Sequence, residues 1–325
     1  MRMTAWVALV GVGLLGARAP RAAAPIRVLL LDGESAGAYH RWQVTTPVLK
    51  RELDETGRFQ VDVLTASPAG ADFSRFTQGL RTAQAVVLNY DAPDERWPAD
   101  VKGAFERYVR DGGGLVTVHA ADNAFPGWVA FNEMIGIGGW RGRTEQAGPL
   151  WYYKDGALQS DGSPGSAGSH GLRTPFPLDV RHPEHPIMRG LPARWMHQGD
   201  ELYAALRGPG HHMTVLATAF SDPANRGTGR DEPQLMVTSY GRGRVFHTTL
   251  GHDVAALSSV DFVVTFQRGT EWAATGAVTQ AVPPGFPTAT IVSYRADLAA
   301  MDPLYKNGLN ALDGSRPQTA GQQGH

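Results

Sequence analysis

Cysteine is absent from the 325 residues of this chain, and charged residues are few. Without cysteine, thiol chemistry is excluded, including the glutamine amidase reaction of a cysteine at a strand end, and so is a lipid-anchor cysteine. Charged residues make up 19% of the chain and the formal net charge is -1. Composition therefore gives no reason to expect nucleic acid or an anionic membrane as partner, and a small neutral ligand fits better.

Long apolar runs are also missing. The longest, at residues 5–16, is shorter than the ~20 residues that a membrane-spanning helix needs. It follows a charged start and precedes a stretch rich in alanine, which is the pattern of a secretory signal. We therefore predict a signal peptide over residues 1–24, a periplasmic or secreted protein, and no membrane association after cleavage. An uncleaved anchor is the alternative.

The remaining chain has the material for one domain. Apolar residues make up 42% of the sequence, with 8 tryptophans to fill a core. We place this domain at residues 26–277. Hydrophobicity becomes sparse after the Pro283-Pro284 pair, so residues 278–325 are predicted to form a C-terminal tail that is peripheral or partly disordered, with one helical turn near Leu298.

Strand and helix patterns alternate through the first half of the domain. Short aliphatic runs at residues 26–31, 59–64, 85–89 and 115–118 are typical of strands buried on both faces, and a helix is predicted to begin at Thr46-Pro47 and another to lie between residues 98 and 112. Such alternation favours an α/β fold with a mostly parallel sheet and helices on both faces.

The second half is less regular. A stretch rich in Gly and Ser at residues 142–169 is predicted to be a long loop inserted over the sheet edge. Strand-like runs follow at residues 177–180, 201–206, 214–218, 234–238 and 244–250, and a closing helix is expected at 258–276.

One histidine holds the most informative position. In the run GGGLVTVHAADN at residues 112–123, a buried strand leads into a sharp turn that presents His119. Ligands of open α/β sheets bind beyond the carboxyl ends of the strands. We therefore predict that His119 is a catalytic acid or base, or a ligand, and the alternative is a histidine that only caps the next helix.

Two more histidines are predicted to reach the same edge of the sheet. His40 lies in the loop after the first strand, and His252 follows Leu250-Gly251 at the end of the last one. His247 lies within that strand and is interpreted as a core residue. Turn or surface positions are expected for His182, His185, His211 and His212.

Carboxylates and a metal complete the candidate chemistry. Asp200 and Glu201 are adjacent, so at most one should enter the pocket; Glu201 is a candidate acid, base or proton shuttle, and either carboxylate can orient a histidine. His40, His119 and His252 with a carboxylate could hold zinc or another divalent metal. No local H-x-H or H-E-x-x-H pattern supports a metal, and no cofactor is firmly implied.

Aromatic and polar residues are candidates for binding a sugar. Flat side chains cover the C–H face of a sugar ring, and we consider Trp42, Trp140, Trp151, Tyr152 and Tyr203 for this role. Asp32 and Asn89, at the ends of the first and third strands, are candidate hydroxyl binders, and Asp200 is a further one.

Several short motifs, in order, resemble the ThuA family, named for trehalose utilisation. They are HRW at 40–42, GGGLVTVHAADNAF at 112–125, Trp128 with Phe131-Asn132, GIG at 136–138, HPI at 185–187, RGLP at 189–192, DELY at 200–203, GRGRV at 241–245, LGH at 250–252 and EWAA at 271–274. The resemblance spans about residues 27–276. It implies a flavodoxin-like fold similar to class I glutamine amidotransferases, with a pocket above His119.

That resemblance implies a role in sugar breakdown, including the processing of 3-keto-glycosides. We predict an exported protein that acts on a keto-sugar or glycoside by histidine acid/base chemistry, through isomerisation, elimination or hydrolysis. The alternatives are a non-catalytic sugar-binding module and a metal-dependent hydrolase. The expected partner is a small-molecule carbohydrate, and homo-oligomerisation stays open.

Overall fold

The computed structural model describes residues 24–35, 40–66, 68 and 72–302. The predicted signal peptide lies outside these residues except for its last position. Within the described ranges, no helix is both long enough and apolar enough to cross a bilayer.

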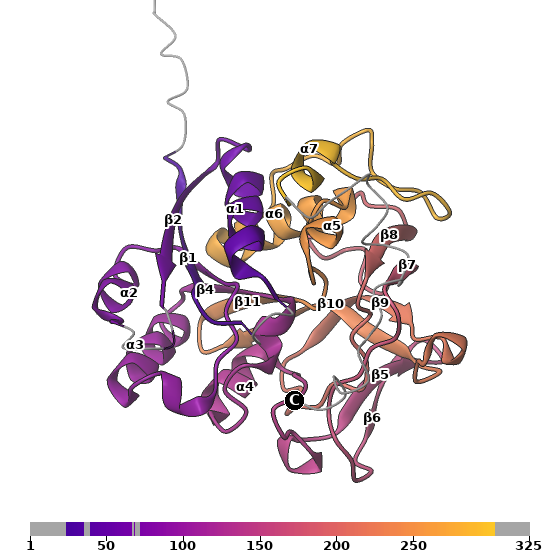
Figure 1. The fold of residues 1–325 in the computed structure, drawn as a ribbon, viewed down its shortest axis with the longest axis horizontal. Helices are drawn as coiled ribbons and strands as arrows, with labels where there is room; N and C mark the ends of the chain where they lie inside the picture. The colour runs from indigo at the N-terminus through magenta and orange to yellow at the C-terminus, as the bar shows by residue number, and fades with distance from the viewer. Residues whose placement is uncertain (1–23, 36–39, 67, 69–71, 303–325) are drawn as a thin grey trace, which may run out of the picture.

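A single sheet organises the described residues (Figure 1). Its main path has the order β2-β1-β3-β4-β11-β10-β9-β7-β8, and the β5–β6 hairpin is attached to β10. The strands are β1 (Ile26–Asp32), β2 (Phe59–Thr65), β3 (Ala85–Leu88), β4 (Gly114–Val118), β5 (Leu150–Lys154), β6 (Ala157–Asp161), β7 (Thr174–Val180), β8 (Arg194–Asp200), β9 (Thr214–Phe220), β10 (Asp231–Tyr240) and β11 (Gly243–Thr248).

The half of the sheet from β2 to β11 is parallel. Side chains on β1 alternate between two hydrophobic cores: Val28 and Leu30 belong to one, and Leu29 and Leu31 to the other. Both faces of this strand are therefore buried, which explains why the sequence shows an unbroken aliphatic run.

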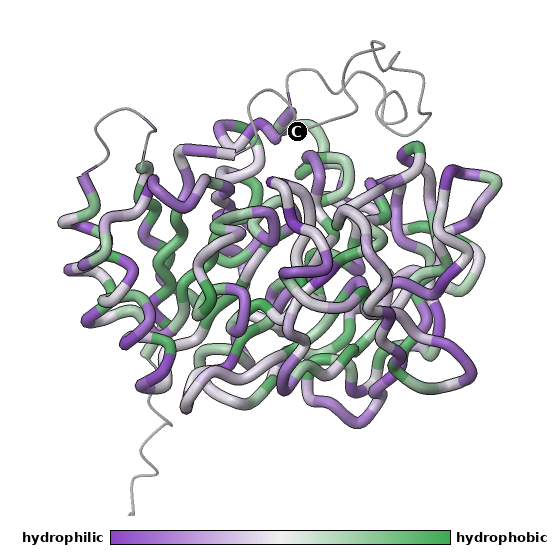
Figure 2. Tube along the Cα trace, turned by 90° about the horizontal axis from the view of Figure 1, so that it is seen from below, coloured by the Kyte–Doolittle hydropathy of each residue, from purple (hydrophilic) through white to green (hydrophobic). Residues whose placement is uncertain are grey.

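Helices cover both faces of this half. The first core includes residues of α1 (Trp42–Asp54), α5 (Val254–Leu257), α6 (Val260–Thr275) and α7 (Ala296–Ala299); the second includes residues of α2 (Ser74–Gly79), α3 (Ala99–Arg110) and α4 (Val129–Ile135). The two groups lie on opposite sides of the strands in Figure 1, and Figure 2 shows the hydrophobic segments concentrated inside. The predicted α/β class, with helices on both faces, is confirmed.

The half from β10 to β8 is antiparallel, which the alternation of elements did not predict. The run at 201–206 is not a strand; it follows β8, and its side chains Tyr203 and Leu206 pack with Ile137 and Met236 in a small separate core. Its apolar pattern thus reflects a loop packed on the sheet. The predicted insertion loop contains the β5–β6 hairpin.

The segment after α6 is an integral part of the fold as far as it is described. Leu298 is fully buried in the first core. The Val260 amide donates to the Ser293 carbonyl (2.9 Å), and Ser259 pairs with Tyr294. Residues 278–302 therefore lie mostly at the surface but are attached to the domain through Leu298, and the turn predicted near Leu298 is present as α7. Residues 303–325 lie outside the described part.

Candidate active site

His119 follows β4 directly and has a φ of +47°, in the left-handed region that side chains other than glycine rarely adopt. Its Nδ1 lies 2.6 Å from the carbonyl oxygen of Thr249. Because a carbonyl only accepts hydrogen bonds, Nδ1 carries the proton, and Nε2 of the neutral ring keeps a free lone pair. Nε2 is buried and has no hydrogen-bond partner.

His252 is presented by a tight exit from β11. Gly251, between the strand and His252, has a φ of +115°, and a Cβ there would lie 3.0 Å from Leu257 and 3.1 Å from Phe262. Only glycine fits this conformation and this space. The turn places Nδ1 of His252 3.0 Å from Oε2 of Glu201.

His40 enters from the segment before α1. Its ring centroid lies 4.9 Å from that of His119 and 5.0 Å from that of His252, and both pairs are edge-on. Nε2 of His40 is 3.5 Å from the Tyr203 hydroxyl, and Nδ1 is buried without a hydrogen-bond partner. The carboxyl ends of β1, β4 and β11 thus bring three imidazoles to one place.

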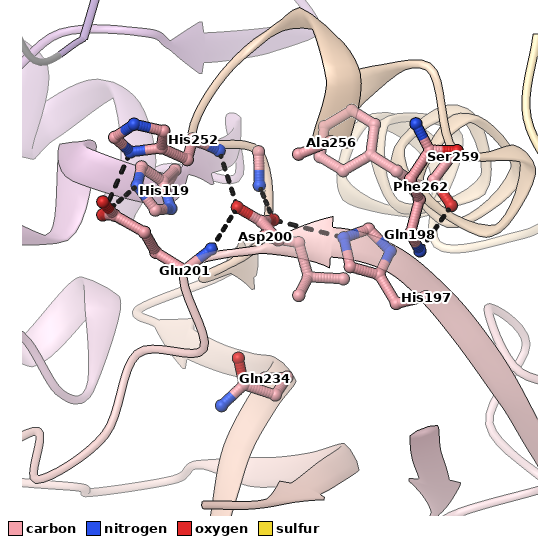
Figure 3. Close-up of polar contacts among 12 residues, drawn as sticks. His119, His197, Gln198, Asp200, Glu201, Gln234, His252, Ala256, Ser259 and Phe262 are labelled. Carbon is pink, nitrogen blue, oxygen red and sulfur yellow. Dashed lines mark hydrogen bonds and ion pairs between the residues drawn. The ribbon is translucent and has the colours of Figure 1, made fainter. Parts of the chain in front are cut away.

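Glu201 completes the cluster from the other half of the sheet. Its Oε2 lies 3.0 Å from His252 and 3.7 Å from Nε2 of His119 (Figure 3). The ligand atoms offered by His40, His119, Glu201 and His252 all lie within 4.8 Å of one another. The four residues that sequence reasoning assigned to catalysis are therefore neighbours; the structure does not test their catalytic roles.

Burial and mutual charge shift the ionisation of the cluster. Burial, together with the nearby rings of His119 and His252, holds the pKa of His40 well below its usual value. Burial alone would raise the pKa of Glu201, but His252 and His119 outweigh it, so that pKa lies well below the ordinary range. Burial opposes protonation of His252, yet the adjacent Glu201 carboxylate raises its pKa overall.

Asp200 lies behind the cluster and holds its backbone. One carboxylate oxygen accepts hydrogen bonds from the amides of Glu201 (2.7 Å) and His252 (3.2 Å), and the other accepts from Gly251 (2.7 Å). Figure 3 shows these bonds linking the end of β8 to the turn after β11. Asp200 is 1% exposed, and these bonds fix the backbone positions of Glu201 and His252.

His197 continues this network into the core. Its two ring nitrogens lie 3.2 Å from Asp200 and 2.9 Å from Asp261, and Asp261 also accepts from the Trp195 indole (2.9 Å). Burial works against a charged imidazole here, but the two carboxylates raise the pKa of His197 to about 10. Burial would raise the pKa of Asp200, and His197 instead lowers it to about 2. The pair is therefore ionised.

An aromatic wall stands beside the cluster. The Tyr203 ring lies 4.1 Å from the His119 ring and 4.4 Å from that of Trp140. Trp140 is only partly buried. The other aromatic candidates differ: the Trp151 indole donates to the Gly208 carbonyl (2.9 Å), Tyr152 packs under Arg230, and Trp42 begins α1.

A further imidazole, His170, was not singled out from the sequence. Its Nε2 lies 3.8 Å from Oε1 of Glu201, on the oxygen that faces away from His252 and His119. Nδ1 lies 2.8 Å from the Gly171 carbonyl and therefore carries the proton in the neutral ring. The only signal in the sequence was a lone histidine at the end of the Gly/Ser-rich insertion.

Asp32 and Asn89 support α1 instead of facing the cluster. The Asn89 amide donates to the hydroxyls of Thr45 and Thr46, each at 2.9 Å. Asp32 is 2% exposed; burial raises its pKa, against hydrogen bonds from Thr65 and Thr46. Both side chains thus have partners in α1, and Asp32 has a further one in β2; Oδ1 of Asp32 is buried without a hydrogen-bond partner.

The remaining histidines within residues 24–302 lie away from the cluster. His247 is fully buried, with Nδ1 3.0 Å from the Ile135 carbonyl and Nε2 3.4 Å from Asp122. His211 is exposed and lies 3.0 Å from Glu133. His182 and His212 are exposed as well, and His185 is half-buried against Trp272, where burial lowers its pKa to about 4.

Three imidazoles and a carboxylate form a donor set that suits a divalent transition metal. Nε2 of His119 has a free lone pair, and its other nitrogen is fixed by a backbone carbonyl, as is usual for histidines that bind metals. The residues therefore fit a metal ion. They can also transfer protons directly, since imidazole and carboxylate are the commonest acid–base groups.

Comparison with known proteins places the chain in a family. The family model ThuA, described as trehalose utilisation, matches residues 27–273. A ThuA-like protein from Parabacteroides merdae ATCC 43184 is 45% identical, with a TM-score of 0.80 over 85% of this chain and 99% of that chain. Another, from Bacteroides uniformis ATCC 8492, is 20% identical with a TM-score of 0.55, over 81% and 98% of the two chains, and shows the fold alone.

Comparison with curated proteins gave no match. The family description points to a carbohydrate-related function. The resemblance stated from sequence motifs is confirmed by the extent of the family match and by the identity to a solved ThuA-like structure. This chain belongs to the ThuA family.

Proposed function

We propose that this protein is a carbohydrate-processing enzyme that moves a proton beside the carbonyl of a keto-sugar or keto-glycoside. The observation that carries the proposal is the convergence of His40, His119, His252 and Glu201 within 4.8 Å. The buried Tyr203 ring packs between His119 and Trp140, and Trp140, which is only partly buried, is the aromatic ring beside the cluster on which a sugar can stack. Polar groups beside an aromatic face are the usual composition of a sugar site.

The chemistry that suits this arrangement begins with removal of the C–H proton next to the carbonyl. The electron pair of that bond moves into the carbonyl and gives an enediolate, which a positive charge stabilises. Return of a proton to the other carbon yields an isomerised sugar; departure of the glycosidic oxygen from the next carbon yields an unsaturated product and an alcohol. Both outcomes need a base, an electrophile and a proton donor close together.

Four residues of the cluster can fill these roles. A neutral imidazole such as His119 can take the proton, His40 or His252 can assist at the carbonyl oxygen, and Glu201 can orient its histidine neighbours or relay the proton. Hydrolysis through a metal ion is a second candidate, favoured by the three-histidine, one-carboxylate donor set. We also propose export to the periplasm or beyond, on the apolar run near the amino terminus.

The test is incubation with 3-keto-trehalose and related 3-keto-glycosides in D₂O, followed by NMR. We expect deuterium to enter at the carbon beside the carbonyl, together with an isomerised or eliminated product. His119→Gln should lower the exchange rate by about 100-fold, as for loss of a general acid–base group. His211→Gln, at an exposed histidine that also pairs with a glutamate, is the matched control.

Two outcomes would decide against this proposal. If the keto-sugars stayed unchanged both with and without added divalent metal, the proposed enzyme activity would be refuted. Saturable sugar binding that persists in His119→Gln and His40→Gln without turnover would identify a sugar-binding module instead.

A further inference from the structure

We propose that His40, His119, His252 and Glu201 are the ligands of one divalent transition-metal ion, and that His170 is an acid–base group beside it rather than a ligand. The binding of the ion does not depend on the proposed function. The role of His170 rests on that function. The argument for the ion uses geometry, burial and hydrogen bonding.

The spacing of the donor atoms fits a metal ion. Bonds of ~2.0–2.1 Å in a tetrahedron place neighbouring donors roughly 3.3 Å apart. The Glu201 oxygen lies 3.0 Å from Nδ1 of His252 and 3.7 Å from Nε2 of His119, on either side of that spacing. All four donors lie within 4.8 Å, so side-chain rotations of about an ångström close the set.

Some buried nitrogens of the cluster lack hydrogen-bond partners. Nε2 of His119 and Nδ1 of His40 make no hydrogen bond, and Nδ1 of His252 has the Glu201 carboxylate 3.0 Å away. Buried polar atoms left in this state destabilise the folded protein. Two such nitrogens, with a third beside the carboxylate they surround, point to a bound cation, because a cation satisfies the nitrogen lone pairs and the carboxylate charge together.

The surroundings hold the ligands in place. His119 donates Nδ1–H to the Thr249 carbonyl, which turns Nε2 toward the cluster. Asp200 accepts from the amides of Glu201 and His252 and so ties together two ligands that are far apart in the sequence. Residues that orient metal ligands in this way are a regular part of metal sites.

The cluster is most open on the side of His170. The His170 side chain is 24% exposed, compared with 3% for His119 and 11% for His252. It approaches the second oxygen of Glu201, beyond the set formed by the other three histidines. An ion at the cluster would occupy the Nε2 lone pair of His119 and supply the positive charge for the carbonyl oxygen of a keto-sugar. With the ion bound, the proton transfer assigned above to His119 would therefore fall to His170 on the open side.

A rigid loop delivers His170. Ser169 and Ala204 exchange two backbone hydrogen bonds of 2.9 and 2.8 Å, and the Gly168 amide donates to the Ala205 carbonyl (2.9 Å). A Cβ at Gly168 would lie 2.6 Å from the Trp140 ring, so glycine is required where the loop crosses the aromatic wall. The inserted segment therefore positions His170 beside Glu201.

The experiment begins with metal removal from the full chain by chelator and dialysis. Calorimetric titration with Zn²⁺, and with Co²⁺ as a coloured probe, should give one ion per chain. X-ray absorption of the Co²⁺ form should show nitrogen and oxygen ligands that include three imidazoles. This measurement on the wild-type protein stays decisive even where a variant fails to fold.

Matched variants then identify the ligands. Glu201→Gln and His252→Gln should weaken Zn²⁺ binding by at least about 100-fold, beyond the loss usual for residues that merely orient a ligand. Glu133→Gln and His211→Gln, from a pair with the same 3.0 Å separation at the surface, should leave the affinity unchanged. Thermal unfolding of each variant without metal checks that the fold persists.

His170→Gln separates the second part of the proposal. It should bind Zn²⁺ as the wild type does but exchange substrate protons about 100-fold more slowly, with a changed pH profile. Weaker metal binding by this variant would make His170 a ligand and overturn its role as an acid–base group. The same role would be overturned if the variant exchanged substrate protons as fast as the wild type, or if the wild type showed no exchange.

The proposed metal site and the proposed function are refuted by different results. No stoichiometric ion in the wild type, or equal losses in the Glu201 and Glu133 variants, would overturn the metal site. One tightly bound ion without any reaction of keto-sugars would leave the metal site standing and remove the proposed function.

Discussion

Glu232 on β10 offers a sharp test of the electrostatics of the fold. Its side chain is 2% exposed; one oxygen accepts from the Thr228 hydroxyl (2.6 Å) and the other from the Ala205 amide (3.2 Å). Burial outweighs these bonds and raises its pKa from 4.5 to about 7. Since one pKa unit is worth ~1.4 kcal/mol, ionising Glu232 costs the folded state about 3 kcal/mol.

The direction in which stability changes with pH follows from the number of protons bound by the folded and unfolded states. Between pH 4.5 and 7 the folded protein retains a proton that the unfolded chain loses, so this contribution to stability falls as the pH rises through that window. Glu232→Gln resembles the protonated residue and removes the effect. We expect the variant to exceed the wild type by about 1 kcal/mol near pH 5 and by about 3 kcal/mol near pH 8.

Urea unfolding at the two pH values measures this difference. Because other groups titrate over the same range, the informative quantity is the change in unfolding free energy between variant and wild type. Glu95→Gln, at an exposed position, is the control and should show no pH-dependent difference. If Glu232→Gln and the wild type lose stability in parallel between pH 5 and 8, the reasoning from burial is refuted.

Three further substitutions test how the fold supports the site. Asp200→Asn, which leaves His197 with a single carboxylate partner, should cost about 3 kcal/mol in urea unfolding; a loss below about 1 kcal/mol would contradict its place in a buried ion pair. Leu298→Ala should cost about 2–5 kcal/mol, and no loss would mean that the segment after α6 is dispensable. Gly251→Ala, at a φ of +115°, should lower the unfolding midpoint and weaken the metal binding that we propose, whereas unchanged values for both would contradict the strain.

The parallel half of the sheet was predictable because its strands are buried on both faces. β1, β2, β3 and β4 begin and end within a residue of the aliphatic runs that identified them. Burial of this kind leaves a continuous apolar signal with few alternatives. The helix α2 gave no such signal, since only Phe76 of its six residues is buried.

The antiparallel half was harder to predict for a physical reason. β8 carries His197, Gln198 and Asp200, all buried but paired with charged or polar partners from the turn after β11, α5 and α6. A strand whose buried side chains are polar does not look like one in a hydropathy pattern. The following loop at 201–206 looks more like a strand because Tyr203 and Leu206 pack inward.

The candidate site likewise has one part that the sequence predicted and one part that it did not. His40, His119 and His252 could be predicted to meet because parallel strands bring their carboxyl ends to one edge. The choice between Asp200 and Glu201 could not be made, because alternation says only that adjacent side chains diverge. The structure makes this choice through the three backbone amides that donate hydrogen bonds to Asp200. These bonds hold the Asp200 carboxylate against the backbone, which leaves the Glu201 carboxylate to contact the histidines.

His170 shows why the rest required coordinates. Its place depends on the bridge between Ser169 and Ala204 and on the fit of Gly168 against Trp140, contacts between segments that no local pattern connects. The same contacts join the inserted segment to the loop that carries Glu201 and Tyr203. A substitution that shifts this bridge should therefore move His170 and the aromatic wall together, so the insertion sets the shape of the open side while the parallel strands set the three inner histidines.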